Sequence, residues 1–317
     1  MLENLIYALN GTLPLFLLMV IGFFLKKIHI LTEGFLKPAN NFNFKVTLPV
    51  LLFTDMATAD FKDTFSLKLL IFCMVVTTVM FWGIWGISKL VMKDKSSVGE
   101  FVQACYRCSL AVNGMALIES LYGSTGTAGT MILGSVPLFN IYAVLLLQAE
   151  SPNMPEGSGS GRMKSALLGI AKNPIIIGIL LGLISSLLSI DYPEIIESTL
   201  NYVGRIGTPL ALICIGAEFE LESAFSKAGK SILASVIKLI VLPAVFIPIA
   251  ILLGFRDSDL ISIMIMMAAP TTPVCYIMAK QYGHEGTITS SVVGLTTLFS
   301  SVTLTLIIFI IRSLGYI

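Results

Sequence analysis

The chain has 317 residues, of which 56% are hydrophobic and only 12% are charged, and its formal net charge is +1. Soluble domains carry about 25% charged residues, so this composition favours an integral membrane protein. The nearly neutral charge excludes a protein that binds nucleic acid through electrostatic attraction to phosphates.

Apolar runs predict the transmembrane helices, because a spanning helix needs about 20 mostly apolar residues. Strong runs occupy residues 5–25, 69–88, 120–149, 173–190, 239–255, 260–279 and 286–311. Weaker runs lie between them, at residues 35–56, 97–119 and 194–217. Charged residues interrupt the weaker runs, so apolar content alone does not establish them as helices.

An internal repeat supports the weaker runs. At an offset of 160 residues, without a gap, turn and helix-breaking residues coincide. The matched residues include Pro14 with Pro174, Gly22 with Gly182, Pro49 with Pro209, Tyr122-Gly123 with Tyr282-Gly283, and Gly134 with Gly294. An apolar composition explains matched leucines but not matched prolines and glycines, so the sequence predicts two copies of one unit.

The repeat predicts an all-α membrane protein with ten transmembrane helices. They span residues 5–27, 35–56, 66–91, 97–122 and 126–148, then 165–189, 194–217, 227–253, 258–282 and 286–312. Five helices is an odd number, so the second half enters the membrane inverted, as in many secondary transporters. Residues 1–148 and 165–317 are the two halves, and the Gly/Ser-rich stretch 149–164 is a flexible cytoplasmic linker.

Basic residues predict the orientation, because cytoplasmic loops are rich in Lys and Arg. One side collects Lys26, Lys27, Lys37, Lys89, Lys93, Lys95, Arg162, Lys164, Lys227, Lys230 and Lys280, and the other has Lys62, Lys68, Arg256 and Arg312. We therefore expect the first side to be cytoplasmic and both termini to lie outside a bacterial inner membrane.

The fourth and ninth helices carry the strongest signals for breaks. The ninth contains Pro270 and Pro273, which remove two helical donors, and the matched stretch of the fourth runs from Ser109 to Gly114. Broken helices persist in lipid only where they line a cavity. Two half-helix N-termini that meet near the midplane would bind an anion.

These breaks define the candidate substrate site. Its residues are Ser109, Asn113 and Gly114 on the fourth helix, Pro270, Thr271, Thr272 and Pro273 on the ninth, Asn140 and Tyr142 on the fifth, and Ser300 and Ser301 on the tenth. Taken singly, each of them favours a role in helix packing, and only the pair of breaks matched through the repeat favours a binding site. Lys238, deep in the eighth helix, either attracts the anion or binds backbone carbonyls at a break. The sequence predicts no acidic residue at this site.

Several motifs, in their order and spacing, resemble the auxin efflux carrier family, which includes bacterial malate and malonate permeases and plant auxin exporters. The motifs are Thr47-Leu48-Pro49-Val50-Leu51-Leu52-Phe53, Leu121-Tyr122-Gly123, Lys172-Asn173-Pro174, Lys238-Leu239 with Leu242-Pro243, and Met278-Ala279-Lys280-Gln281-Tyr282-Gly283. Together they extend over essentially the whole chain.

The resemblance implies that the fourth and ninth helices cross, as in sodium/proton antiporters and bile-acid symporters. It also implies that helices 1, 2, 6 and 7 form a scaffold, which dimerises through helices 2 and 7, while the other six form a moving transport domain. The substrate carboxylate would lie near Ser109 and Tyr142. Ser109 replaces the usual Asn of the family, Ala116 replaces a common proline, and residues 69–88 lack the acid proposed to handle protons.

We therefore expect a carrier for a small carboxylate such as malate, malonate or an auxin-like acid. Two alternatives stay open: a sodium-coupled symporter of the bile-acid type and a sensor that does not transport. No zinc-protease motif or phosphate-binding loop occurs, so the sequence predicts no enzyme, no metal and no cofactor.

Overall fold

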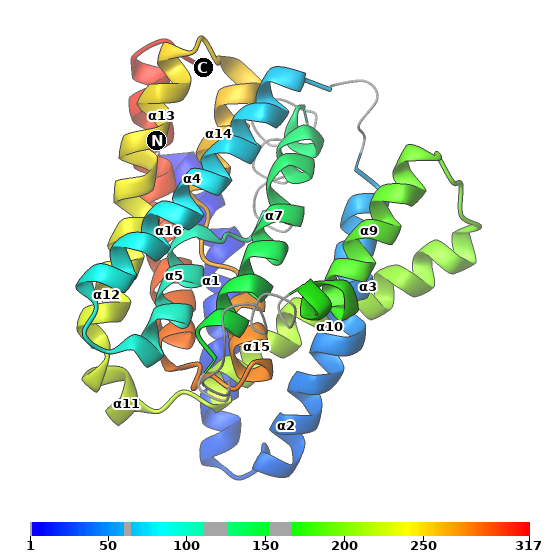
Figure 1. Ribbon diagram of the computed structural model, residues 1–317, viewed down its shortest axis with the longest axis vertical. Coiled ribbons are helices and arrows are strands. Elements are labelled where there is room, and N and C mark those ends of the chain that lie inside the picture. The colour runs from blue at the N-terminus through cyan, green and yellow to red at the C-terminus, as the bar shows by residue number, and fades with distance from the viewer. Residues whose placement is uncertain (1, 60–64, 111–125, 152–166) are drawn as a thin grey trace.

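The computed structural model describes residues 2–59, 65–110, 126–151 and 167–317, and these residues form helices and no strand (Figure 1). Asn113 and Gly114, two of the expected site residues, lie outside the described residues. Five of the described helices are long and apolar enough to cross a bilayer. Many large side chains on the outer surface are apolar, among them Leu90 and Leu252, which are 86% and 85% exposed. Such a surface suits contact with lipid.

The first half contains interrupted as well as continuous helices. Its elements are α1 (Leu2–Lys27), α2 (Glu33–Phe42), the π-helical η1 (Asn43–Thr47), α3 (Leu48–Ala57), α4 (Leu67–Val91), the 3₁₀ turn η2 (Lys95–Ser97), α5 (Val98–Tyr106) and α7 (Ala128–Ala149). The expected second span thus consists of α2, η1 and α3. The expected fourth span is helical only as far as Tyr106 among the described residues.

The second half follows the same order. Its elements are a helical stretch at residues 167–172, α9 (Pro174–Leu187), α10 (Glu194–Ala217), α11 (Leu221–Ser226), α12 (Ala228–Val236), the π-helical η3 (Ile237–Val241), α13 (Leu242–Leu252), α14 (Asp257–Ala268), α15 (Val274–Gln281) and α16 (Thr287–Ser313). The expected helix at 165–189 is interrupted at Asn173. The Oδ1 of Asn173 accepts hydrogen bonds from the N–H groups of Ile175 and Ile176, so Asn173 caps a new helix.

Both π-helical segments precede a proline. Pro49 and Pro243 lack an N–H, so neither can bond the carbonyl four residues earlier, in η1 and η3 respectively. A local change to wider hydrogen bonding accommodates this loss within a continuous helix. The expected second span therefore contains a π-bulge immediately before Pro49.

Glycines bring two helix pairs into backbone contact. A Cβ on Gly22 of α1 would lie 2.1 Å from the carbonyl oxygen of Ile213 on α10. A Cβ on Gly182 of α9 would lie 2.4 Å from the carbonyl oxygen of Phe53 on α3. Gly22 matches Gly182 in the repeat, and Phe53 matches Ile213, so the two halves make the same contact. This equivalence supports the repeat, while the inverted arrangement of ten helices stays a prediction.

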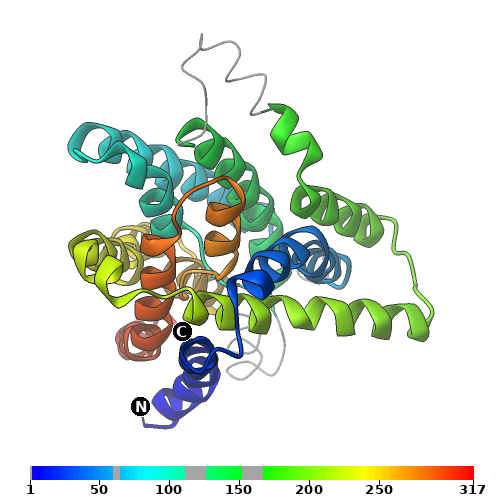
Figure 2. The same ribbon diagram turned by 90° about the horizontal axis from the view of Figure 1, so that it is seen from below.

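The helices pack in two neighbouring sets. In one, α10 contacts α1, α2 and α3, and α3 contacts α9. In the other, α4 packs against α5 and α7, α12 against α16, and α13 against α14. Seen from below, α10 (light green) runs across the blue helices α1 to α3, beside the second set (Figure 2). Contacts of α1 with α16 and of α15 with α10 join the sets.

Candidate functional site

The ends of two helices, α5 and α14, meet beside each other. α5 ends at Tyr106 and α14 ends at Ala268, and an extended stretch follows each helix. The N–H of Ser109 donates to the carbonyl oxygen of Pro270 at 2.9 Å. The hydroxyl of Thr271 donates to the carbonyl oxygen of Ala104 at 2.8 Å. The predicted break of the ninth helix therefore lies at residues 269–273.

Side chains satisfy other backbone groups that the break exposes. The amide of Gln103 donates to the carbonyl of Cys275 at 2.9 Å, and the hydroxyl of Thr296 on α16 accepts from the N–H of Thr271 at 3.0 Å. Irregular backbone at membrane depth is stable only when such partners exist. Hydrogen bonds from neighbouring helices thus stabilise the break.

A small, mostly apolar cavity lies at this meeting point, with a volume of about 60 Å³. Its polar lining residues come from three helices and from the two extended stretches, and they are Asp55, Arg107, Ser109, Asn140, Thr208 and Thr272. Leucine, isoleucine, valine, methionine and phenylalanine side chains make up most of the remaining wall. A few polar groups that converge in an apolar wall are typical of a small-molecule site.

Arg107 places a positively charged side chain in the wall of the cavity. Its side chain is buried, with 2% exposure, directly after the last turn of α5. Nη2 donates to Oδ1 of Asn140 at 2.9 Å and Nη1 lies 3.0 Å from the sulfur of Met278, while Nε has no hydrogen-bond partner. None of the ion pairs among the described residues includes Arg107.

A buried guanidinium that forms no direct ion pair with any described carboxylate is costly, because burial has removed its hydration. An anionic ligand in the cavity would supply a direct ion-pair partner. The planar guanidinium also matches a carboxylate with two parallel hydrogen bonds. Sequence reasoning missed Arg107 because an arginine in a weak apolar run also suits a helix end at the interface. The signal that could have identified it is its position two residues before Ser109.

Three of the predicted residues come together at the cavity, namely Ser109, Asn140 and Thr272. Pro270 and Thr271 instead hold the two extended stretches together through the bonds described above. Pro273 precedes the first turn of α15. The predicted residues thus divide into those that line the cavity and those that support its backbone.

Tyr142 and Lys238 lie away from the cavity lining. The ring of Tyr142 stacks on Phe81 with centroids 4.4 Å apart, and its hydroxyl lies 3.0 Å from that of Thr78. Lys238 is completely buried, and its Nζ donates to the carbonyl oxygen of Met266 at 3.3 Å. Of the two roles that the sequence left open for Lys238, this contact matches the carbonyl clamp.

Ser300 and Ser301 on α16 also lie away from the cavity lining. Their hydroxyls bond carbonyls one turn back in their own helix. Both residues therefore match the packing interpretation that the sequence allowed.

Asp55 contradicts the expectation that the site holds no acid, because this residue of α3 lines the same cavity as Arg107. It lies two residues before the end of α3, a position from which a charged side chain normally reaches water. The described residues contain no cluster of three potential metal ligands.

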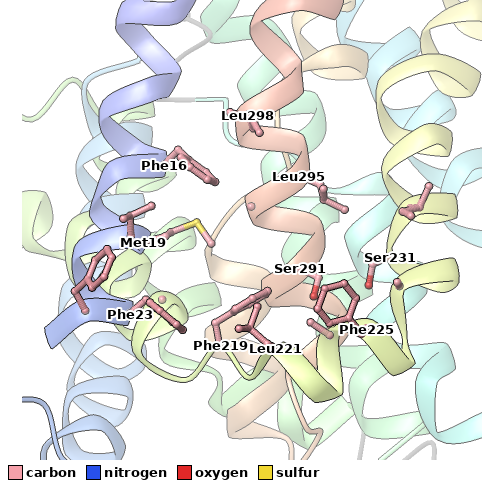
Figure 3. A pocket seen from close by; sticks show the side chains of 17 residues that line it. Phe16, Met19, Phe23, Phe219, Leu221, Phe225, Ser231, Ser291, Leu295 and Leu298 are labelled. Atoms are coloured by element: carbon pink, nitrogen blue, oxygen red, sulfur yellow. The ribbon is translucent and has the colours of Figure 1, made fainter. Parts of the chain in front are cut away.

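A larger groove of about 580 Å³ lies between α1, α11, α12 and α16 (Figure 3). Phe16, Met19 and Phe23 of α1 face Phe225 of α11 and Leu295 of α16 across it. Its lining has hydroxyls at Ser231 and Ser291 and no charged side chain. This groove offers no positive charge to bind a carboxylate, so the smaller cavity is the better candidate in spite of its size.

Comparison with known proteins identifies the family. The family described as "Membrane transport protein" matches residues 7–308. The chain belongs to this family, which includes the auxin efflux carriers. It is therefore a multi-pass membrane protein of a transporter family, in agreement with the resemblance seen in the sequence motifs.

Relatives in this membrane transport protein family are distant but extend over most of the chain. An uncharacterized transporter of Methanothermobacter thermautotrophicus is 23% identical and covers 93% of this chain and 95% of its own. Auxin efflux carrier component 5 of Arabidopsis thaliana is 24% identical, over 87% of this chain and 88% of its own. A putative malonate transporter of Rhizobium meliloti is 25% identical over 51% of this chain and 53% of its own.

Proposed function

We propose that this protein is a secondary transporter of a small organic anion, either a dicarboxylate such as malonate or malate or an auxin-like carboxylate. The observation that carries the proposal is the buried guanidinium of Arg107, which forms no ion pair with any described residue and lies where the ends of α5 and α14 meet. A substrate carboxylate would supply a direct ion-pair partner. The name of the Rhizobium relative supports malonate as the first substrate to test.

The cavity offers a division of roles for recognition. Arg107 would bind the carboxylate, and Asn140 would hold the guanidinium in position through the bond from Nη2 to Oδ1. Ser109 and Thr272 would add neutral hydrogen-bond donors from the two breaks. The apolar remainder of the wall would exclude water, which strengthens each of these interactions.

An elevator-type alternating-access mechanism fits this arrangement. We assign the scaffold to α1, α2–α3, α9 and α10, and the transport domain to α4, α5, α7 and α12–α16. Backbone contacts at Gly22 and Gly182 lie within the proposed scaffold, whereas the apolar groove of Figure 3 lies between the two sets. The same proposal includes a homodimer formed through the second and seventh helices. It also includes the inverted ten-helix topology and the orientation in the inner membrane.

Transport assays in liposomes test the proposal. Purified protein should take up radiolabelled malonate, malate or an auxin-like acid, and Arg107→Gln should reduce the rate at least about tenfold, because it removes a charge-assisted contact. Arg205→Gln is the matched control, since Arg205 is exposed on α10. Equal rates in the wild type and Arg107→Gln, or no uptake of any organic anion, would refute the proposal.

The same assay separates the alternatives. Uptake that requires a sodium gradient would favour a sodium-coupled symporter. Substrate binding without uptake, together with cysteine labelling at the cavity from only one side of the membrane, would favour a sensor.

A further inference from the structure

Asp55 and Arg107 line one cavity from different helix sets. Asp55 lies on α3, and Arg107 follows α5. Asp55 is partly buried, and among the described residues it forms no hydrogen bond and no ion pair. Nε of Arg107 is also without a partner. One acidic and one basic side chain therefore line the same cavity, and the carboxyl of Asp55 and Nε of Arg107 each lack a hydrogen-bond partner among the described residues.

Other charged groups near α3 do not compensate Asp55. Helix α9, which packs against α3, has no titratable residue. Helix α10 contributes Glu194, Glu197, Tyr202 and Arg205, all exposed, and η1 contributes the exposed Lys45. Tyr192 packs its ring against Phe53, on the same helix as Asp55.

The cavity itself contributes only two titratable partners from the described residues. They are Arg107 and the buried thiol of Cys108. The electrostatic balance of the cavity thus depends on Asp55 and Arg107.

We propose that binding of a substrate carboxylate at Arg107 is coupled to the uptake of one proton by Asp55, an inference that rests on the proposed function. In the empty cavity one negative and one positive charge offset each other. A carboxylate adds a second negative charge, and like charges repel strongly in a poorly hydrated site. A proton from the aqueous phase adds to a carboxylate oxygen of Asp55, and it returns to water when the substrate leaves.

Malonate binding at different pH values tests this coupling. By linkage, the dissociation constant of the wild type should rise with pH and approach a tenfold change per pH unit above about pH 7.5, where both malonate and Asp55 of the empty cavity are ionised. Asp55→Asn should bind malonate with a pH dependence that reflects only the ionisation of malonate itself. Asp55→Glu should restore the wild-type slope, and Asp191→Asn, an exposed loop variant, should leave it unchanged.

Proton uptake measured on the wild type provides a second readout that does not depend on the folding of any variant. Above pH 7.5 malonate is fully ionised, so protons taken up from a weakly buffered solution must bind the protein. We expect about one proton for each malonate bound. No uptake would overturn the coupling.

The remaining outcomes are distinguishable. A slope for Asp55→Asn equal to that of the wild type would overturn the coupling and leave carboxylate transport intact. Tighter binding of a zwitterionic amino acid than of malonate would also overturn it, since Asp55 would then bind an ammonium group. No binding of any carboxylate by the wild type would refute the proposed function instead.

Discussion

The N–H of Ser109 donates a hydrogen bond to the carbonyl oxygen of Pro270, and the two atoms are 2.9 Å apart. This bond joins the two helix interruptions through main-chain atoms, so no side-chain substitution removes it directly. Proline cannot donate to a helix, but its carbonyl still accepts. The residue that breaks the ninth helix therefore also binds the extended stretch that follows α5.

Thr271→Ala should weaken this junction. The variant leaves the carbonyl of Ala104 without the hydroxyl that now donates to it at 2.8 Å, at a cost of about 0.5–1.5 kcal/mol. We expect lower transport and a slightly lower melting temperature, both restored in Thr271→Ser, which keeps the hydroxyl. Thr303→Ala is the control, because that hydroxyl bonds only its own helix. Normal transport by Thr271→Ala would show that the junction tolerates this loss.

Glu218→Gln should loosen the contact between the two helix sets. The carboxylate of Glu218, at the end of α10, accepts from Asn40 of α2 at 2.9 Å and also binds Tyr276 and Lys280 of α15. A loss of about 1–2 kcal/mol corresponds to a factor of 5–30 in an opening equilibrium. The buried thiol of Cys214, one turn earlier on α10, should then react faster with a permeant maleimide.

Glu222→Gln, an exposed change on α11, should leave the labelling of Cys214 unaltered. Equal labelling of the wild type and Glu218→Gln would mean that the carboxylate does not restrain the two sets.

Glu100→Gln should destabilise the start of α16. The buried carboxylate of Glu100 accepts from the N–H groups of Gly286, Ile288 and Thr289, so it caps a helix from a distant part of the chain. An amide has one acceptor oxygen and places an NH₂ group against a backbone donor. We expect a loss of about 1–3 kcal/mol, seen as a lower melting temperature in detergent.

Glu285→Gln is a stringent control for Glu100, because Glu285 neighbours the same helix start but is exposed and pairs with Lys227. An unchanged melting temperature for Glu100→Gln would contradict the capping role.

Asp94 gives a pH-dependent contribution to stability. Hydrogen bonds from Lys230, Ser96 and Ser97 hold the pKa of Asp94 well below the usual carboxyl range. Because the pKa is lowered on folding, the stabilisation is present above about pH 4 and is lost as the pH falls toward the folded value. The carboxylate is 42% exposed, so solvent screening limits the contribution to less than about 1 kcal/mol.

Asp94→Asn should therefore lower the melting temperature slightly at pH 7 in low salt. The difference from the wild type should shrink in 1 M salt. A difference that grows with salt would exclude an electrostatic origin.

The sequence predicted those features that depend on backbone chemistry. Pro270 and Pro273 have no N–H to donate in any environment, so their presence alone predicts the break of the ninth helix. The matched Gly22 and Gly182 were equally informative, since each permits the same close helix contact. The proline break depends only on local sequence, and the glycine contacts depend on positions matched by the repeat, so both can be predicted without the tertiary structure.

The sequence did not predict the charges of the cavity. Arg107 and Asp55 each lie within a few residues of a helix end, where a charged residue normally reaches water. Their depth depends on which helices cover them, and this is a property of tertiary packing. Tyr142 lies on a helix that lines the cavity, as expected, but its ring stacks on Phe81 and does not line the cavity.

The glycine contacts of α1 with α10 and of α9 with α3 have a mechanical consequence. A Cβ on Gly216 would lie 1.8 Å from the carbonyl oxygen of Met19, and one on Gly178 would lie 2.4 Å from that of Pro49. Sliding either pair by one residue would bring side chains against these carbonyls. Each helix pair therefore resists sliding and moves as one rigid unit. Displacement of one part of the molecule against another is then easiest along the soft, side-chain-lined boundary between α1 and α16.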